Sequence, residues 1–129
     1  MVRRKNQGFT LMEMLIVVAI IAILVAIAIP TVQNSLHKAK VAADWANVRA
    51  LYASLQADYI MTGEWIPEYS DTNGFPRQEL QFYDDRKPTQ TVKLKAGYAF
   101  VRGTKTGYQI YYACMQAHDR CELLLGPGN

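Results

Sequence analysis

A stretch of twenty-one residues, 9–29, constrains this chain more than any other feature of its sequence. Thirteen of these residues are Leu, Ile, Val or Phe, and only Glu13 carries a charge. As an α-helix the stretch rises about 32 Å, enough to cross the hydrocarbon core of a bilayer. Its apolar side chains favour insertion by roughly 6 kcal/mol, against a cost of at most about 3 kcal/mol for one carboxylate near a helix end. The sequence therefore predicts a membrane-spanning helix.

The charges of the chain are distributed unevenly. The net charge of +3 comes from Arg3, Arg4 and Lys5, because the other 11 basic residues balance 11 acidic ones. Basic residues just before an apolar span predict that the N-terminus stays in the cytoplasm. The positive net charge is thus interpreted as a membrane-topology signal rather than as a sign of nucleic-acid binding.

Three interpretations of the apolar helix are open at this point. It could be a plain membrane anchor. It could also be a secretory signal, since Ala26-Ile27-Ala28 is an A-x-A triplet, and cleavage after Ala28 would release a soluble binding domain. The third interpretation starts from Glu13, five residues after Gly8. A charge at that position costs free energy in an anchor and in a signal alike, so we expect a partner that compensates it.

The first thirty residues resemble the class III signal of type IV prepilins and pseudopilins. The shared features are a short basic leader, Gly8 before Phe9, Glu13 at the fifth position of the mature chain and Pro30 at its twenty-second. The resemblance implies that a membrane-embedded prepilin peptidase cuts between Gly8 and Phe9 and that the new amine of Phe9 is methylated. Residues 1–8 would be the leader, and residues 9–30 would stay attached as a transmembrane and assembly helix.

The same resemblance implies a structural function. The chain would be a subunit of a type IV pilus-like filament, with a type II secretion pseudopilus or a competence pilus for DNA uptake as alternatives. Its partners would be copies of itself, the prepilin peptidase, an inner-membrane assembly platform and, before assembly, membrane lipid. It would lie in the bacterial cytoplasmic membrane first and in an extracellular or periplasmic filament afterwards.

Two features of the apolar helix bear on assembly. The resemblance implies that Glu13 offsets the positive amine of Phe9 in a neighbouring subunit, a pairing that would also set the axial register. Many family members carry Gly or Pro midway through the segment, whereas residues 19–22 contain neither, so local melting of the helix in a filament is left open. Pro30 removes a backbone donor and is expected to bend or loosen the helix.

Beyond Pro30 the apolar residues recur at alternating steps of four and three, which predicts an amphipathic helix over residues 31–62. Gly63 is well placed to end it. The apolar stripe, expected to pack on a sheet, consists of Val41, Trp45, Val48, Tyr52, Leu55 and Tyr59.

Residues 31–129 are predicted to form a globular domain of the pilin fold, in the α+β class. Prolines, Gly74 and a polar run predict a long loop over residues 63–90. The sheet and a cysteine loop are expected over residues 91–129. Strands are predicted at 91–95, 98–102 and 108–114, with a hairpin turn at 103–107 and a short last strand at 122–125. The expected fold is a small antiparallel sheet of three or four strands with the amphipathic helix across it.

Some polar residues invite a binding interpretation beside a plain one. Asp84 and Asp85 could ligate calcium, but adjacent carboxylates are weak evidence. Four cations of the predicted strand region are either solvated residues or a DNA-binding patch: Lys93, Lys95, Arg102 and Lys105.

Cys114 and Cys121 predict a disulfide, because an even pair at short spacing most often forms one in an exported chain. Their spacing does not match the common zinc signatures. Two reduced, half-buried thiols are the alternative. His37 and His118 have no nucleophile or metal set near them in sequence and are interpreted as surface residues. There is no glycine-rich phosphate loop, so neither a cofactor nor enzyme activity is expected.

Overall fold

A computed structural model describes residues 8–116 and 121–127 and divides the chain into two compact units, Met1–Leu36 and His37–Asn129. One long helix, α1 (Leu11–Thr62), begins in the first unit and ends in the second. In the first unit, every described residue is exposed, and the helix continues through Pro30 without interruption. Directly after Pro30, the Thr31 hydroxyl donates to the Ile27 carbonyl of the preceding turn at 3.5 Å.

The second unit contains the C-terminal half of α1, a one-turn 3₁₀ helix η1 (Pro67–Tyr69) and six strands. A four-stranded antiparallel sheet has the order β1-β4-β5-β6, and β2 and β3 form a separate two-stranded sheet. The strands are β1 (Pro76–Arg77), β2 (Glu79–Asp84), β3 (Lys87–Lys93), β4 (Gly97–Thr104), β5 (Gly107–Cys114) and β6 (Leu123–Leu125).

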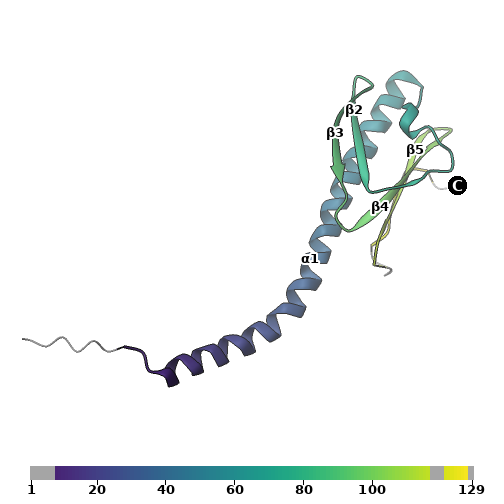
Figure 1. Cartoon of the computed structure of the whole chain (residues 1–129). Helices are drawn as coiled ribbons and strands as arrows, with labels where there is room; N and C mark the ends of the chain where they lie inside the picture. The colour runs from purple at the N-terminus through teal and green to yellow at the C-terminus, as the bar shows by residue number, and fades with distance from the viewer. Residues whose placement is uncertain (1–7, 117–120, 128–129) are drawn as a thin grey trace, which may run out of the picture. The chain divides into compact units, whose positions relative to one another are not determined.

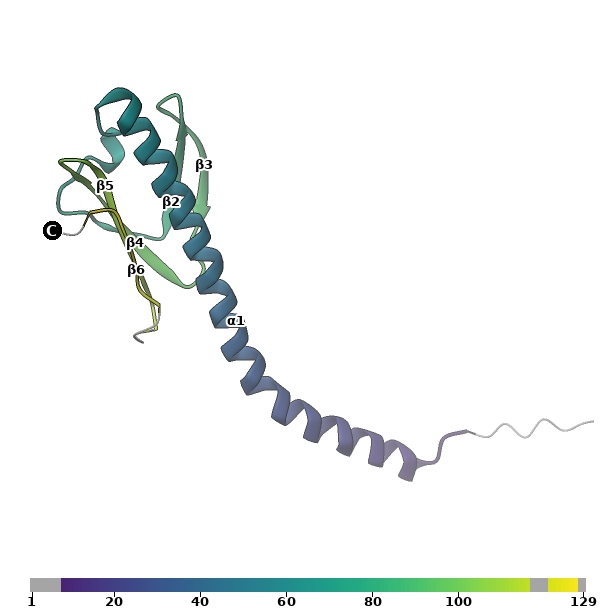
Figure 2. The same cartoon turned by 180° about the vertical axis from the view of Figure 1, so that it is seen from behind.

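The helix covers one face of the strands in this unit, as the two opposite views in Figures 1 and 2 show. All six residues of the predicted stripe are buried or half-buried, and Leu51 and Asp44 are buried with them. On the sheet, the inward residues of β4 alternate with half-exposed ones, and Tyr108, Ile110 and Tyr112 of β5 are fully buried. The predicted α+β fold, with the helix laid on an antiparallel sheet, is confirmed.

Gly63 ends the helix as predicted. Its φ of 74° lies in the left-handed region that glycine adopts without steric cost, and its N–H donates to the Tyr59 carbonyl at 2.8 Å.

The predicted loop over residues 63–90 is wrong in its second half. Residues 79–84 and 87–93 pair as an antiparallel hairpin, β2–β3. Its turn residues, Asp85 and Arg86, have φ values of 48° and 60°, the positive values of a type I′ turn. Arg86 is held by Glu64, whose carboxylate lies 2.9 Å from the guanidinium, and by the Trp65 carbonyl at 3.0 Å.

The strand predicted at 91–95 also joins a different sheet from the one expected. It forms the end of β3 and pairs with β2, whereas β1 completes the four-stranded sheet at Phe100 and Ala99 of β4. The strands predicted at 98–102, 108–114 and 122–125 correspond to β4, β5 and β6. The turn between β4 and β5 is shorter than predicted, only Lys105 and Thr106.

Candidate functional site

The start of α1 forms a capping box. The Thr10 N–H donates to the Glu13 carboxylate at 2.9 Å, and the Glu13 N–H donates to the Thr10 hydroxyl at 3.3 Å. Thr10 precedes the first helical residue and Glu13 is the third, the spacing at which these two side chains satisfy each other's backbone donors. A carboxylate in the first turn also interacts favourably with the helix dipole.

The capping box changes the argument about Glu13. The sequence predicts a carboxylate that nothing in its own chain compensates, whereas the structure gives it one backbone donor within the same chain. That donor uses one lone pair of an exposed carboxylate, so the remaining acceptor capacity of Glu13 is available to a second partner.

Within the described residues, every side chain of the apolar part of α1 is exposed. The helix is long and apolar enough to cross a membrane, and none of its most apolar window is buried. The exposed large side chains include Ile16, Ile20, Ile23 and Ile27, between 52% and 67% exposed. Between Gly8 and Leu36, Glu13 is the single charged residue.

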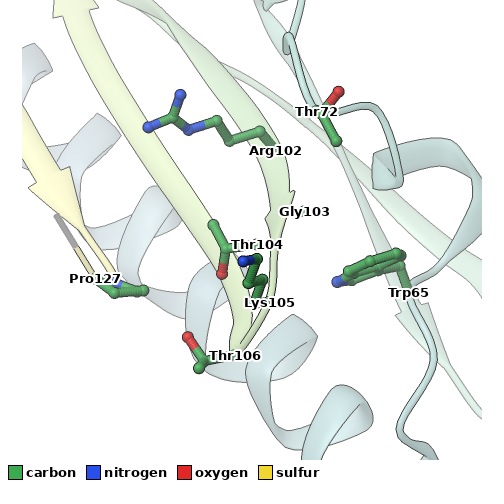
Figure 3. A pocket seen from close by; sticks show the side chains of 8 residues that line it. All are labelled: Trp65, Thr72, Arg102, Gly103, Thr104, Lys105, Thr106 and Pro127. Carbon is green, nitrogen blue, oxygen red and sulfur yellow. The ribbon is translucent and has the colours of Figure 1, made fainter. Parts of the chain in front are cut away.

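Two of the four cations considered for DNA line a common groove. Arg102 and Lys105 line a groove at the turn end of β4, which Figure 3 shows with Trp65 and Pro127 on its two sides. Lys93 ends β3, Lys95 lies before β4, and neither lines this groove.

Cys114 and Cys121 form a disulfide with their Cα atoms 5.6 Å apart, and both residues are buried. His37 is half-buried rather than a surface residue, and its Nε2 lies 3.7 Å from the Cys121 sulfur. The three side chains have the types of metal ligands within 4.8 Å of one another, but the disulfide occupies both sulfurs. His118 lies outside the described residues.

Asp84 and Asp85, considered as calcium ligands, end β2 and begin the hairpin turn, and both are exposed. In the described part of the chain, these two carboxylates do not belong to a cluster of three or more ligand groups. The calcium interpretation stays a prediction.

Asp44 is the functional-looking residue that the sequence did not reveal. It is fully buried, and its carboxylate accepts three hydrogen bonds, from the Lys95 N–H at 2.7 Å, the Ala96 N–H at 2.7 Å and the Tyr112 hydroxyl at 2.9 Å. Burial raises the pKa of Tyr112, and the hydrogen bond to Asp44 raises it further. The three donors come from the β3–β4 connection and from β5, so the hydrogen bonds of Asp44 link α1 to both segments. We interpret this constellation as structural.

These features define a class of protein that joins one exposed apolar helix, able to cross a membrane, to an α+β domain built on the C-terminal half of the same helix. Residues 3–29 match the family model for the prokaryotic N-terminal methylation motif. The chain is 38% identical over 82 residues to the type IV major pilin protein PilA of Myxococcus xanthus, covering 64% of this chain and 37% of that one.

Two further relatives broaden the comparison. The type II secretion system core protein G of Pseudomonas aeruginosa is 40% identical over 55 residues, 43% of this chain and 39% of its own. The type IV narrow pilus major component PilA5 of Thermus thermophilus is 42% identical over 78 residues, 54% of this chain and 67% of its own. The chain thus spans less than two fifths of the length of the first two relatives. No solved structure matches the chain significantly.

The chain belongs to the family of type IV pilins and pseudopilins. Proteins of this family are structural subunits rather than enzymes, and their N-terminal motif fits membrane anchoring.

Proposed function

We propose that this chain is the structural subunit of a type IV pilus-like filament. It is made as a membrane precursor, cut between Gly8 and Phe9, methylated on the new amine of Phe9, and polymerised through residues 9–30. The observation that carries the proposal is the exposed apolar half of α1 with its single charge, Glu13. Such a surface is stable in lipid before assembly and against the same helix of neighbouring subunits afterwards.

Glu13 gives the proposed assembly its register. In a bundle of apolar helices, a carboxylate is tolerated when it meets a cation, and the amine of Phe9 in a neighbouring subunit supplies one. Only one axial offset between two helices brings these charges together. The Thr10 donor then holds the Glu13 side chain in a defined orientation for that contact.

The remaining partners follow from the proposed steps of membrane insertion, cleavage and polymerisation. The precursor crosses the bacterial cytoplasmic membrane once, with residues 1–8 on the cytoplasmic side, where the prepilin peptidase and the assembly platform act on it. The filament then lies outside that membrane. The similarity to a type II secretion core protein supports a pseudopilus as the second candidate, in which the same polymerisation serves secretion.

The capping box makes the test of Glu13 sharper than a simple deletion. Glu13→Gln keeps a side chain that can accept the Thr10 N–H but removes the charge, whereas Thr10→Val weakens the cap and keeps the charge. Each variant is expressed with the prepilin peptidase, its mature N-terminus is read by mass spectrometry, and sheared filaments are quantified. We expect N-methyl-Phe9 in the unsubstituted chain and in both variants. Glu13→Gln should give at least about tenfold fewer filaments than the unsubstituted chain, and Thr10→Val a near-normal number.

Three outcomes contradict the proposal. A mature chain that begins at Ile29 would show a released soluble domain. Normal filament yield from Glu13→Gln would show that the charge has no role in assembly. Loss of filaments from Thr10→Val, with normal filaments from Glu13→Gln, would show that Glu13 acts only as a helix cap.

A further inference from the structure

The groove at the turn end of β4 carries two cations that lie outside residues 9–30, the segment proposed for polymerisation. Its volume of about 460 Å³ lies within the roughly 300–1,000 Å³ of small-ligand sites. The described part of the chain contains ion pairs at Arg77–Glu68 and Arg86–Glu64, and none at Arg102 or Lys105.

A buried amide orients the guanidinium of Arg102 without neutralising it. Gln109 is only 4% exposed, its side-chain oxygen accepts the Nε–H of Arg102, and its Nε2 donates to the Pro127 carbonyl at 2.6 Å. Asp71 contacts the same region through its backbone, but its carboxylate accepts the Asn73 N–H at 2.9 Å. Gln109 thus fixes two sides of the groove and leaves the terminal nitrogens of Arg102 for an external acceptor.

Threonine hydroxyl groups line the groove together with the two cations. Thr72, Thr104 and Thr106 line the groove (Figure 3). The hydroxyl oxygen of Thr104 is buried and has no hydrogen-bond partner within the described residues. Each hydroxyl can donate and accept, which suits a ligand that is itself rich in hydroxyl groups.

The walls and the floor of the groove are rigid. Trp65 donates its indole N–H to the Gly107 carbonyl at 3.1 Å and stacks on Tyr59 with ring centroids 6.1 Å apart. It also packs on Gly103, where an added Cβ would come within 3.2 Å of the indole. The turn is tied to α1, because Gln56 donates to the Thr106 carbonyl at 3.0 Å. A ligand would therefore meet a preformed site.

We propose that this groove binds a saccharide that carries one acidic group, a carboxylate or a phosphate. Arg102 and Lys105 would bind the acidic group, the threonines would bond ring hydroxyls, and Trp65 and Pro127 would pack against the apolar face of the sugar. An inorganic anion would leave the hydroxyls and apolar walls without contacts. Nucleic-acid binding is less well served, because Lys93 and Lys95 do not line the groove, and only Arg102 and Lys105 remain there for a phosphate backbone.

The test uses the full chain in detergent micelles, so that filament formation does not enter the readout. Isothermal titration calorimetry compares galacturonate and galactose 6-phosphate, which each carry one acidic group, with neutral galactose. We expect both acidic sugars, or one of them, to bind at least about tenfold more tightly than the neutral one, and Arg102→Gln and Lys105→Gln each to weaken that binding about tenfold. Lys95→Gln, an exposed lysine outside the groove, is the matched control and should change nothing.

Three results would overturn the proposal, provided that near-UV circular dichroism shows the variants folded. These are equal affinity for the neutral sugar, unchanged affinity in both groove variants, and tighter binding of a single-stranded oligonucleotide that depends on the groove cations. Binding of inorganic phosphate as tightly as the acidic sugars would also count against a saccharide site.

Discussion

Asp44 shows how a single buried carboxylate can connect distant parts of this chain. Its three donors lie 51, 52 and 68 residues away in sequence, so no local pattern around residue 44 could predict them. In the sequence it looks like one of the solvated charges beside the apolar stripe. A buried carboxylate without a cation is stable only when its acceptor capacity is used, and here two backbone N–H groups and a tyrosine hydroxyl use it.

We therefore expect Asp44→Asn to destabilise the fold although it preserves the shape of the side chain. The amide replaces one acceptor oxygen with a donor, which must face a backbone N–H of Lys95 or Ala96. The free energy of unfolding should fall by about 3 kcal/mol in chemical denaturation. Glu79→Gln, an exposed carboxylate, is the control and should change it by less than about 0.5 kcal/mol. A loss that small for Asp44→Asn would mean that the carboxylate is not needed.

At the scale of elements, the sequence predicts those strands whose signals are local. β4 and β5 are runs of β-branched and aromatic residues joined by a glycine-flanked turn, and the amphipathic helix has a regular period, so both were predictable. The β2–β3 hairpin was not. Its turn is Asp85-Arg86 rather than Asn-Gly or Asp-Gly, Pro88 lies inside β3, and a bulge separates Phe82 from Tyr83. The hairpin turn also contacts a segment distant in sequence, because Arg86 pairs with Glu64.

The groove could be predicted only in part, because some of its lining residues come together only through tertiary contacts. Arg102 and Lys105 belong to one predicted hairpin, so their proximity follows from the local sequence. Trp65 and Pro127 come from segments that pack there only in the folded domain. Their position depends on contacts such as that of Gly103 with Trp65, which the chain order does not reveal.

Tyr69 joins η1 to β2 and makes this junction sensitive to alkaline pH. Its hydroxyl donates to the Gln81 carbonyl at 3.0 Å and accepts the Gln81 N–H at 2.8 Å. Burial raises the pKa of Tyr69 to about 12, against about 10 for an exposed tyrosine. Burial also raises the pKa of Tyr108 and of Tyr112.

The sign of the pH dependence follows from proton release. Below pH 10 tyrosine is protonated in both states, so the stability is fully present. Between about pH 10 and 12 the unfolded chain loses the Tyr69 proton while the folded chain keeps it, and the free energy of unfolding therefore falls. Tyr69→Phe should lower stability at pH 8 by about 1 kcal/mol and should make the decline between pH 10 and 12 less steep. Urea denaturation across this range measures both effects, and a decline as steep as in the unsubstituted chain would exclude Tyr69 as its source.

At the scale of the whole molecule, the chain divides its two tasks between its two units. No described residue before His37 is buried, and the first buried residue is Val41. The hydrophobic core lies entirely in the second unit, whereas the continuous exposed apolar surface lies in the first. The energy that stabilises the fold and the surface proposed for polymerisation thus come from different residues.

Because of this division, a chain of residues 31–129 should fold without the apolar helix. It keeps every core residue, the Asp44 hydrogen bonds and the disulfide. The described residues that it loses are all exposed. We expect a water-soluble monomer by light scattering, with cooperative thermal unfolding and the near-UV spectrum of the full chain in detergent. Asp44→Asn should lower its stability as in the full chain, and restoring residues 9–30 should restore self-association. A truncated chain that is molten, or that still oligomerises, would show that folding and assembly share residues in a way that this division does not allow.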